Sequence, residues 1–306
     1  MEISINNIPD NGDEWEKLCM ECYRYKYQND HFTLVPAVHG GDAGIEAFTG
    51  SGIVCQCYCP ERSYNDTEYY EHIRDKMTTD LNKLLDPAYE KRLQDMGVPK
   101  ITEWHYMIPD YRDARILEHA EKKKRAVIEA RKAYISDGFR IQIVVFADLK
   151  VTIAALLREE LIKGKIDVAT SVDIDWTTCP SEKISNIRRK IKAVKTTATD
   201  SEIEAAVEYF AKAYLDGLSL MERYRTEYPQ IHKDLFALQQ SYSGIVKSKS
   251  IMLADKKMNS SHFHMILDEF GERLKTQFAY ISEANICALQ NDLVSGWLAD
   301  CSLSFA

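Results

Sequence analysis

Residues 40–60, GGDAGIEAFTGSGIVCQCYCP, hold two carboxylates and an amide that a hairpin would bring together. Asp42 lies in a glycine-rich turn, Glu46 follows that turn, and Gln56 lies on the apolar stretch after it. Side chains alternate along a strand, and a hairpin between the two stretches folds Glu46 back towards Gln56. The pattern therefore predicts a carboxylate and an amide oxygen at one point, and these are ligands that Mg²⁺ accepts.

A metal ion at this point would suit the hydrolysis of a phosphodiester. Carboxylates hold the cation, which polarises the phosphate and generates hydroxide, and a nearby lysine usually stabilises the developing charge. The residue two positions after Gln56 is Tyr58, a phenol with a pKa of about 10 that supplies no permanent positive charge. Lys76 is the best substitute, with Lys83 two turns further along the same predicted helix.

These motifs resemble the Mrr-type branch of restriction-endonuclease-like nucleases, which have the PD-(D/E)XK fold. That branch carries FE or WE on an opening helix, GxDxGI(D/E) at a turn and QxK on the next strand. The matching residues here are Trp15, Glu16, 40–46 and Gln56. The resemblance covers residues 10–85 and implies a metal held by Glu46 and Gln56. It also implies help from Glu16 on the opening helix, with Asp42 secondary.

The chain departs from the family pattern at two positions. Glu46 stands where the family usually has an aspartate, and Tyr58 stands where it has its catalytic lysine. Two functions therefore stay open. One is a metal-dependent DNA endonuclease that uses Mg²⁺ or Mn²⁺, with Glu46, Gln56 and Lys76 as its catalytic residues. The other is a catalytically degenerate nuclease fold that binds DNA or scaffolds a larger assembly.

A third class, an enzyme acting on a small molecule, finds less support in the sequence. The chain contains no GxGxxG, GxxxxGK[ST], GxSxG or HExxH motif. A cysteine nucleophile at Cys57 or Cys59 would need a histidine in reach, and His39 is the only one near in sequence. A plain structural turn at 40–46 is the remaining interpretation.

The segments around the candidate site alternate between helix and strand. Asp13 as N-cap, with Glu16 three residues later, predicts a helix over the following residues. Residues 139–147, FRIQIVVFA, form an apolar run typical of a strand covered on both faces. Further strands are expected at 31–38, 45–50, 52–59 and 102–109, and helices at 66–85, 112–136 and 151–162. The alternation predicts an α/β domain over 1–180, a mixed sheet flanked by helices.

From residue 181 to 306 almost every segment has a helical pattern, which predicts an all-α second domain. Residues 200–228 begin with an acidic first turn that suits the helix dipole, and 264–281 carry an amphipathic stripe. The last stretch, 284–305, ends with apolar residues right to the terminus. Such a segment either packs on the body of the protein or docks into a partner's groove.

A nuclease-like domain followed by a helical tail with a Trp-Leu segment resembles effector subunits of bacterial antiphage systems. In Lamassu-like three-component systems, an SMC-like or ABC-type ATPase holds the nuclease. The resemblance implies an ATPase partner at the helical domain, with DNA as the substrate of the complex. Self-association through 181–306 is the alternative, because many nucleases need two active sites to cut both strands.

Composition sets limits on partners. The 306 residues are 45% hydrophobic and 28% charged, with a net charge of −8, which argues against a protein that coats nucleic acid by itself. Two basic runs, 121–132 and 183–195, are expected to be solvated helix faces, although the second also fits a phosphate track. The N-terminus lacks a signal-peptide pattern and no apolar run spans a bilayer, which predicts a cytoplasmic protein.

The eight cysteines are expected to be reduced thiols in such a compartment. Cys19 and Cys22 form a CxxC, but no second pair completes a zinc site, so buried structural cysteines are the preferred interpretation. The histidines of HFH, residues 262–264, lie two apart and would not share a helix face.

Overall fold

The computed structural model describes residues 3–4, 9, 11–36, 44–61, 64–168, 174–252, 255–300, 303 and 305. The chain divides into two compact units, Met1–Lys163 and Gly164–Ala306. The first is a mixed α/β unit and the second is helical, so the predicted order of an α/β part followed by a helical part is confirmed.

The N-terminal unit is built on a five-stranded mixed sheet with the order β2-β3-β4-β5-β6. The strands β2, β3 and β4 are antiparallel neighbours, whereas β4, β5 and β6 run parallel. Ala47 pairs with Cys55, and Cys55 pairs with His105 on the next strand. The strands are β2 (Thr33–Leu34), β3 (Ala47–Phe48), β4 (Ile53–Cys57), β5 (Ile101–Met107) and β6 (Ile135–Val144).

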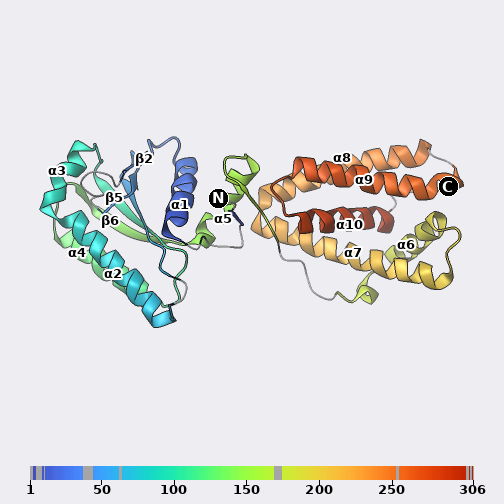
Figure 1. Cartoon of the computed structure of the whole chain (residues 1–306), viewed down its shortest axis with the longest axis horizontal. Coiled ribbons are helices and arrows are strands. Elements are labelled where there is room, and N and C mark those ends of the chain that lie inside the picture. The colour runs from blue at the N-terminus through green and yellow to red at the C-terminus, as the bar shows by residue number, and fades with distance from the viewer. Residues whose placement is uncertain are drawn as a thin grey trace. The chain divides into compact units, whose positions relative to one another are not determined.

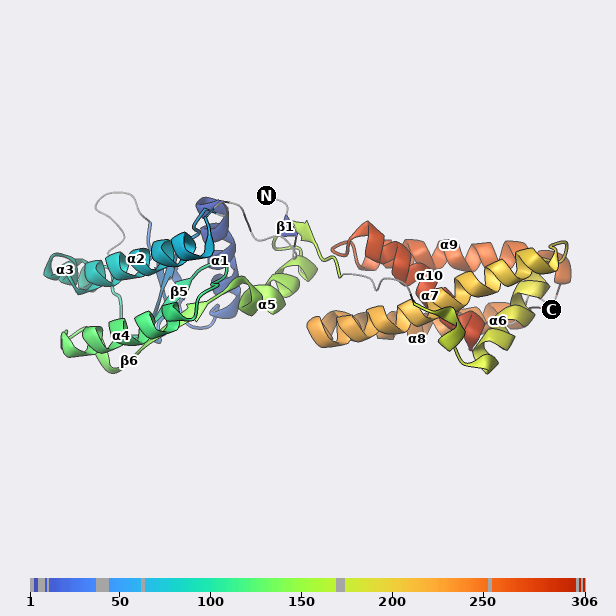
Figure 2. The ribbon, with the colours of Figure 1, turned by 90° about the horizontal axis from the view of Figure 1, so that it is seen from below.

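Helices cover both faces of this sheet (Figures 1 and 2). The helices α2 and α4 lie on the face that carries Val54, Trp104 and Tyr106, and together they form the main apolar core. On the other face α1 packs against β4, and α5 packs against α1. The helices are α1 (Gly12–Lys26), α2 (Asp66–Leu85), α3 (Pro87–Asp95), α4 (Arg115–Glu129) and α5 (Phe146–Arg158).

The helix α2 has the bounds that the sequence predicts, residues 66–85. Its start is specified locally, because Asn65 caps the backbone N–H groups of Thr67 and Glu68 while the Glu68 side chain accepts the Asn65 N–H. The predicted cap of α1 at Asp13 is wrong. Asn11 is the N-cap, and its side chain accepts the N–H of Glu14 at 2.9 Å.

The prediction that residues 139–147 form a strand covered on both faces is also wrong. The strand β6 lies at the edge of the sheet, and its burial alternates. Phe139 is buried, whereas Arg140 and Gln142 are exposed. The apolar appearance of the run comes from one covered face together with Val144 at the strand's end, which is buried.

The helical unit is arranged around its last helix, α10 (Glu283–Ala299), which Figure 1 shows among α7, α8 and α9. Most faces of α10 are buried, including Leu289, Val294 and Leu298. Leu303 beyond it is also fully buried. The apolar C-terminal stretch is therefore explained by packing within the unit. The other helices are α6 (Ser181–Val194), α7 (Asp200–Glu227), α8 (Pro229–Met252) and α9 (Asn259–Gln277).

The helical unit also includes a segment before the composition change at 181. Ile166 and Val168 are buried, and the Asn285 side chain binds both the N–H and the carbonyl of Val168, at 2.7 and 2.9 Å. Short elements complete the structure: β1 (Ile3–Ser4), β7 (Gly164–Lys165), and the 3-10 turns η1 (Trp176–Thr178) and η2 (Lys256–Met258). Within the described ranges, none of the helices has the length and apolar character needed to cross a membrane.

Candidate active site

The hairpin of β3 and β4 places Glu46 directly beside Gln56. The Glu46 N–H donates to the carbonyl of Cys55 at 2.7 Å, which sets the register of the hairpin. The Gln56 amide Nε2 donates to Glu46 Oε1 at 2.6 Å, and the backbone N–H of Cys57 donates to Oε2 at 2.8 Å. Both carboxylate oxygens of Glu46 are therefore held in position by β4.

The Gln56 amide has one unused oxygen. Gln56 is 1% exposed, and its Oε1 has no hydrogen-bond partner among the described residues. A buried amide oxygen normally finds a donor, and an orphan of this kind calls for an explanation such as an ion or a water. The amide turns its nitrogen, not this oxygen, towards the Glu46 carboxylate, so a cation that both residues hold would require the amide to turn over.

Glu46 is an electrostatically perturbed carboxyl group. Its pKa is raised to about 8, because burial and the nearby carboxylate of Glu16 raise it more than hydrogen bonding to Cys57 and the positive charge of Lys76 lower it. A carboxyl group with such a pKa is mostly neutral at pH 7 unless a cation favours its ionised form.

Glu46 lies on the wall of a pocket of about 420 Å³ that also contains three carboxylates from α1. These are Asp13, Glu16 and Glu21, and one side of the pocket is apolar, formed by Leu34, Val35 and Pro36. Glu16 and Glu46 thus line the same pocket. Asp42, the fourth predicted metal residue, lies outside the described residues.

The candidate lysines gather around a different carboxylate, Asp80. Lys76 Nζ lies 2.6 Å from Asp80 Oδ2 and 2.8 Å from Oδ1, and Lys83 Nζ lies 3.7 Å from Oδ1. Asp80 is fully buried. Gly44, with a φ of +77°, packs on the Asp80 backbone, and a Cβ on Gly44 would lie 2.5 Å from the Asp80 carbonyl oxygen. Gly44 therefore lies against α2 beside Asp80, the carboxylate that both lysines contact.

Tyr58 follows β4 and is half-buried against the core on the α2 side. Burial raises the pKa of its phenol, so the hydroxyl remains neutral. In the described part of the chain, neither this hydroxyl nor a lysine ammonium hydrogen-bonds to Glu46. Lys76 does lie near enough for its positive charge to lower the pKa of Glu46.

Asp80 could not be recognised as part of the site from its sequence position, since many helices carry an aspartate four residues after a lysine.

A second group of side chains that the sequence analysis missed connects α1 to β5. The Tyr23 hydroxyl contacts His105 Nδ1 at 2.8 Å, and His105 Nε2 contacts Glu103 at 3.0 Å. Glu103 also pairs with Arg140 on β6. The alternation of Glu103 and His105 in TEWHYM is the signal that they share a strand face.

The cysteines near the site have the character of core residues. Cys19, Cys22, Cys55 and Cys57 are buried, and the seven cysteines in the described ranges are free thiols. Burial raises the pKa of the Cys57 thiol well above its ordinary value, which opposes a nucleophilic role. His39, its suggested partner, lies outside the described residues.

Basic side chains of the run 183–195 form ion pairs and hydrogen bonds within the helical unit. Lys183 Nζ pairs with the Asp300 carboxylate at 2.6 Å, and Arg188 binds Glu204 through two hydrogen bonds of 2.7 Å. Lys190 is 1% exposed and donates to the carbonyls of Trp297 and Asp300 at the end of α10. These pairings favour a structural role over a phosphate track.

Among the residues for which the structure gives a placement, no three His, Cys, Asp or Glu side chains gather into a metal site. The candidate donor set therefore consists of Glu46 and the Gln56 amide, with Glu16 in the same pocket. No family model, curated protein or solved structure matches this chain. Its function is consequently argued from the geometry of its own residues.

Proposed function

We propose that the N-terminal unit is a metal-dependent DNA endonuclease that hydrolyses phosphodiester bonds with Mg²⁺ or Mn²⁺. The observation that carries this proposal is the environment of the Glu46 carboxyl group. Two donors on β4 hold its carboxylate, burial and Glu16 raise its pKa to about 8, and the orphan oxygen of Gln56 lies on the residue beside it. A divalent cation would favour the ionised form of Glu46 and give the oxygen of Gln56 a partner.

In this proposal Glu46 and Gln56 hold the cation, and Glu16 supplies a further carboxylate from α1. The bound cation would supply the positive charge that polarises the scissile phosphate. The N–H of Cys57 keeps the carboxylate of Glu46 in a fixed orientation, so little reorganisation is needed when substrate arrives. Lys76 acts from α2, where Asp80 keeps its side chain ordered near the site.

A second function is favoured by one specific observation, the pairing of the candidate lysines with Asp80. An ammonium held at 2.6 Å by a buried carboxylate is not free to neutralise a phosphate, and Tyr58 at the usual lysine position supplies no charge. The alternative is therefore a catalytically degenerate nuclease fold that binds DNA or scaffolds an ATPase complex.

The proposal also includes a biological setting, an antiphage complex. An effector subunit of an antiphage complex would be delivered to DNA by an SMC-like or ABC-type ATPase, which suits a chain with a net charge of −8. Because α10 is enclosed by its own unit, a partner of this kind would bind the outer surfaces of the helical unit rather than the C-terminal stretch.

Cleavage of supercoiled plasmid DNA with Mg²⁺ or Mn²⁺ tests the enzyme directly. We expect nicking or cutting by the wild type, and a loss of roughly 100-fold or more in Glu46→Ala and in Lys76→Ala. Lys91→Ala is the matched control, since Lys91 forms the same kind of pair with Asp95 at 2.7 Å on an exposed helix face. Loss in Glu46→Ala alone would move the lysine role to Lys83.

Metal binding provides a second readout that does not depend on turnover. Mn²⁺ should raise the melting temperature of the wild type and leave Glu46→Gln unchanged. The rise should be larger at pH 9 than at pH 6, because the cation binds the ionised carboxylate and the pKa of Glu46 is about 8. A metal effect with no cutting, even when an ATPase partner is added, would favour the degenerate alternative.

A further inference from the structure

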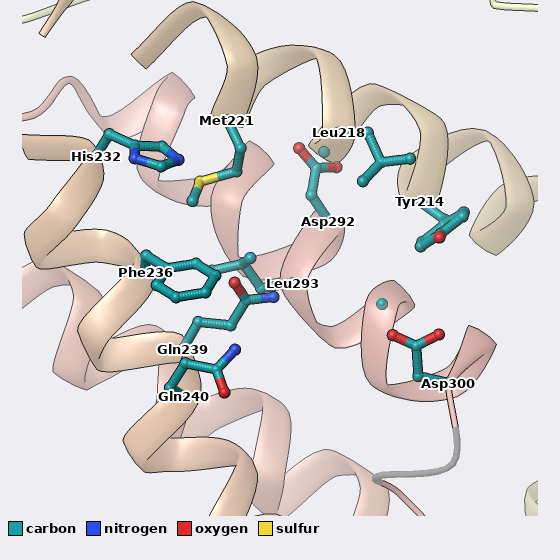
Figure 3. A pocket seen from close by; sticks show the side chains of 12 residues that line it. Tyr214, Leu218, Met221, His232, Phe236, Gln239, Gln240, Asp292, Leu293 and Asp300 are labelled. Carbon is teal, nitrogen blue, oxygen red and sulfur yellow. The ribbon is translucent and has the colours of Figure 1, made fainter. Parts of the chain in front are cut away.

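The helical unit contains a pocket of about 300 Å³ between α7, α8 and α10 (Figure 3). This volume is at the lower end of the range for sites that bind small molecules. Leu218 and Met221 line it from α7, Phe236 from α8, and Leu293 from α10. These side chains make most of its lining apolar.

One carboxylate in this apolar pocket lacks a full set of partners. Asp292 on α10 is 6% exposed, and its Oδ2 has no hydrogen-bond partner within the described part of the chain. Asp300, which also lines the pocket, differs in that Lys183 pairs with its carboxylate. Asp292 is thus the carboxylate of the pocket that a ligand's positive charge would satisfy.

The backbone holds Asp292 at this position. Gly217 on α7 has no side chain, and a Cβ there would lie 2.6 Å from the Cβ of Asp292. Gly217 thus allows α7 and α10 to approach closely at Asp292. Burial, with the help of the nearby Asp216, raises the pKa of Asp292 to about 8, so the pocket holds a carboxyl group that a bound cation would ionise.

The rim of the pocket suits an organic cation. The rings of His232 and Phe236 stack with centroids 6.2 Å apart and form an aromatic wall. Phe236 is 49% exposed and Leu218 is 55% exposed, so an apolar ligand body would cover surface that now faces water. Aromatic faces also attract cations.

We propose that this pocket binds a small organic amine with an apolar body, whose ammonium group pairs with Asp292 and whose body lies between Leu218 and Phe236. This site is separate from the proposed nuclease centre and does not depend on it. A buried carboxylate with an oxygen that lacks a partner discriminates strongly between a charged amine and an uncharged molecule of the same shape.

The test uses the full chain and a set of primary aryl- and alkylamines, each matched with the alcohol of the same carbon skeleton. Binding is measured by ligand-observed NMR and by calorimetry. We expect at least one amine, for example 2-phenylethylamine, to bind roughly tenfold or more tightly than its alcohol. The preference should disappear in Asp292→Asn, with folding checked by circular dichroism.

Phe236→Ala provides a second variant on the pocket's rim, at a side chain that is 49% exposed. It should weaken amine binding, whereas Tyr209→Ala, which removes a ring of similar exposure (52%) on α7, should not. Equal binding of amines and alcohols, full binding by Asp292→Asn, or no binding by any amine would overturn the proposal. Binding of Nα-acetyl-lysine methylamide alone would assign the pocket to a partner's lysine and would also overturn it.

Discussion

At the scale of single residues, each unit contains a largely buried carboxyl group whose pKa is raised well above its ordinary value. Burial and a neighbouring carboxylate, Glu16 or Asp216, together raise the pKa of Glu46 and of Asp292 to about 8. They differ in their partners, since β4 donates two hydrogen bonds to Glu46. Carboxyl groups in this state are costly to a fold, and they are typical of sites that bind cations.

The pH dependence of stability follows from the raised pKa of Asp292. Its folded pKa, about 8, lies above the ordinary value of 3.8, so its stabilising contribution is complete below pH 3.8 and is lost as pH rises through 8. Asp292→Asn should therefore raise the free energy of unfolding at pH 9 by a few kcal/mol, since each pKa unit corresponds to about 1.4 kcal/mol.

Urea denaturation at pH 5 and pH 9 measures this effect. The difference between Asp292→Asn and the wild type should be small at pH 5 and should grow by pH 9. A difference that does not vary with pH would show that Asp292 is already satisfied in the folded chain.

At the scale of elements, close contacts position both candidate sites. Gly44 allows the turn before Glu46 to lie against α2 at Asp80, and Gly217 allows α7 to lie against α10 at Asp292. A helix contact of this kind needs a residue without a side chain, whereas a glycine on an open helix surface only lowers helix propensity. The two kinds of glycine respond to substitution in opposite ways.

Gly217→Ala should destabilise the chain, because its new Cβ would lie 2.6 Å from the Cβ of Asp292 and neither helix can move without losing core packing. Gly244→Ala on α8 is the matched control, since nothing lies within 4 Å of its Cβ position. It should stabilise the chain by about 0.5–1 kcal/mol. Thermal denaturation of both variants measures the contrast, and a stabilised Gly217→Ala would contradict the packing.

At the scale of the whole molecule, each unit has its own core, and the segment before residue 181 contributes to the second one. Ile166 is fully buried, and the buried side chain of Asn285 is satisfied by Val168 and by the hydroxyl of Tyr224. The helical unit thus needs residues that have no helical pattern of their own.

A fragment of residues 164–306 should fold with a cooperative transition and a strongly helical spectrum. A fragment of 181–306 should be less stable by several kcal/mol, because it loses two buried apolar side chains, at about 1.5–3 kcal/mol each, and leaves Asn285 with unpaired groups. Denaturant titration of both fragments compares them. Equal stability would mean that residues 166–168 contribute nothing to the unit.

The sequence by itself determined the features that depend on near neighbours. The pattern of 66–85 predicts α2 at its observed bounds, and the capping box that the structure shows at Asn65 explains where it begins. The change to helical patterning predicts the class of the second unit. The alternation along 53–57 also predicts that Gln56 meets Glu46. Such features are decided by sterics and hydrogen bonds within a few residues.

Only the tertiary structure decided which groups share an environment. It places Lys76 and Lys83 at Asp80, puts β6 at the edge of the sheet, encloses α10 among other helices and buries Asp292 against Gly217. The same residue types would be exposed or paired differently with another order of strands or helices. Charge pairing and burial depend on contacts between distant parts of the chain, and no local pattern records them.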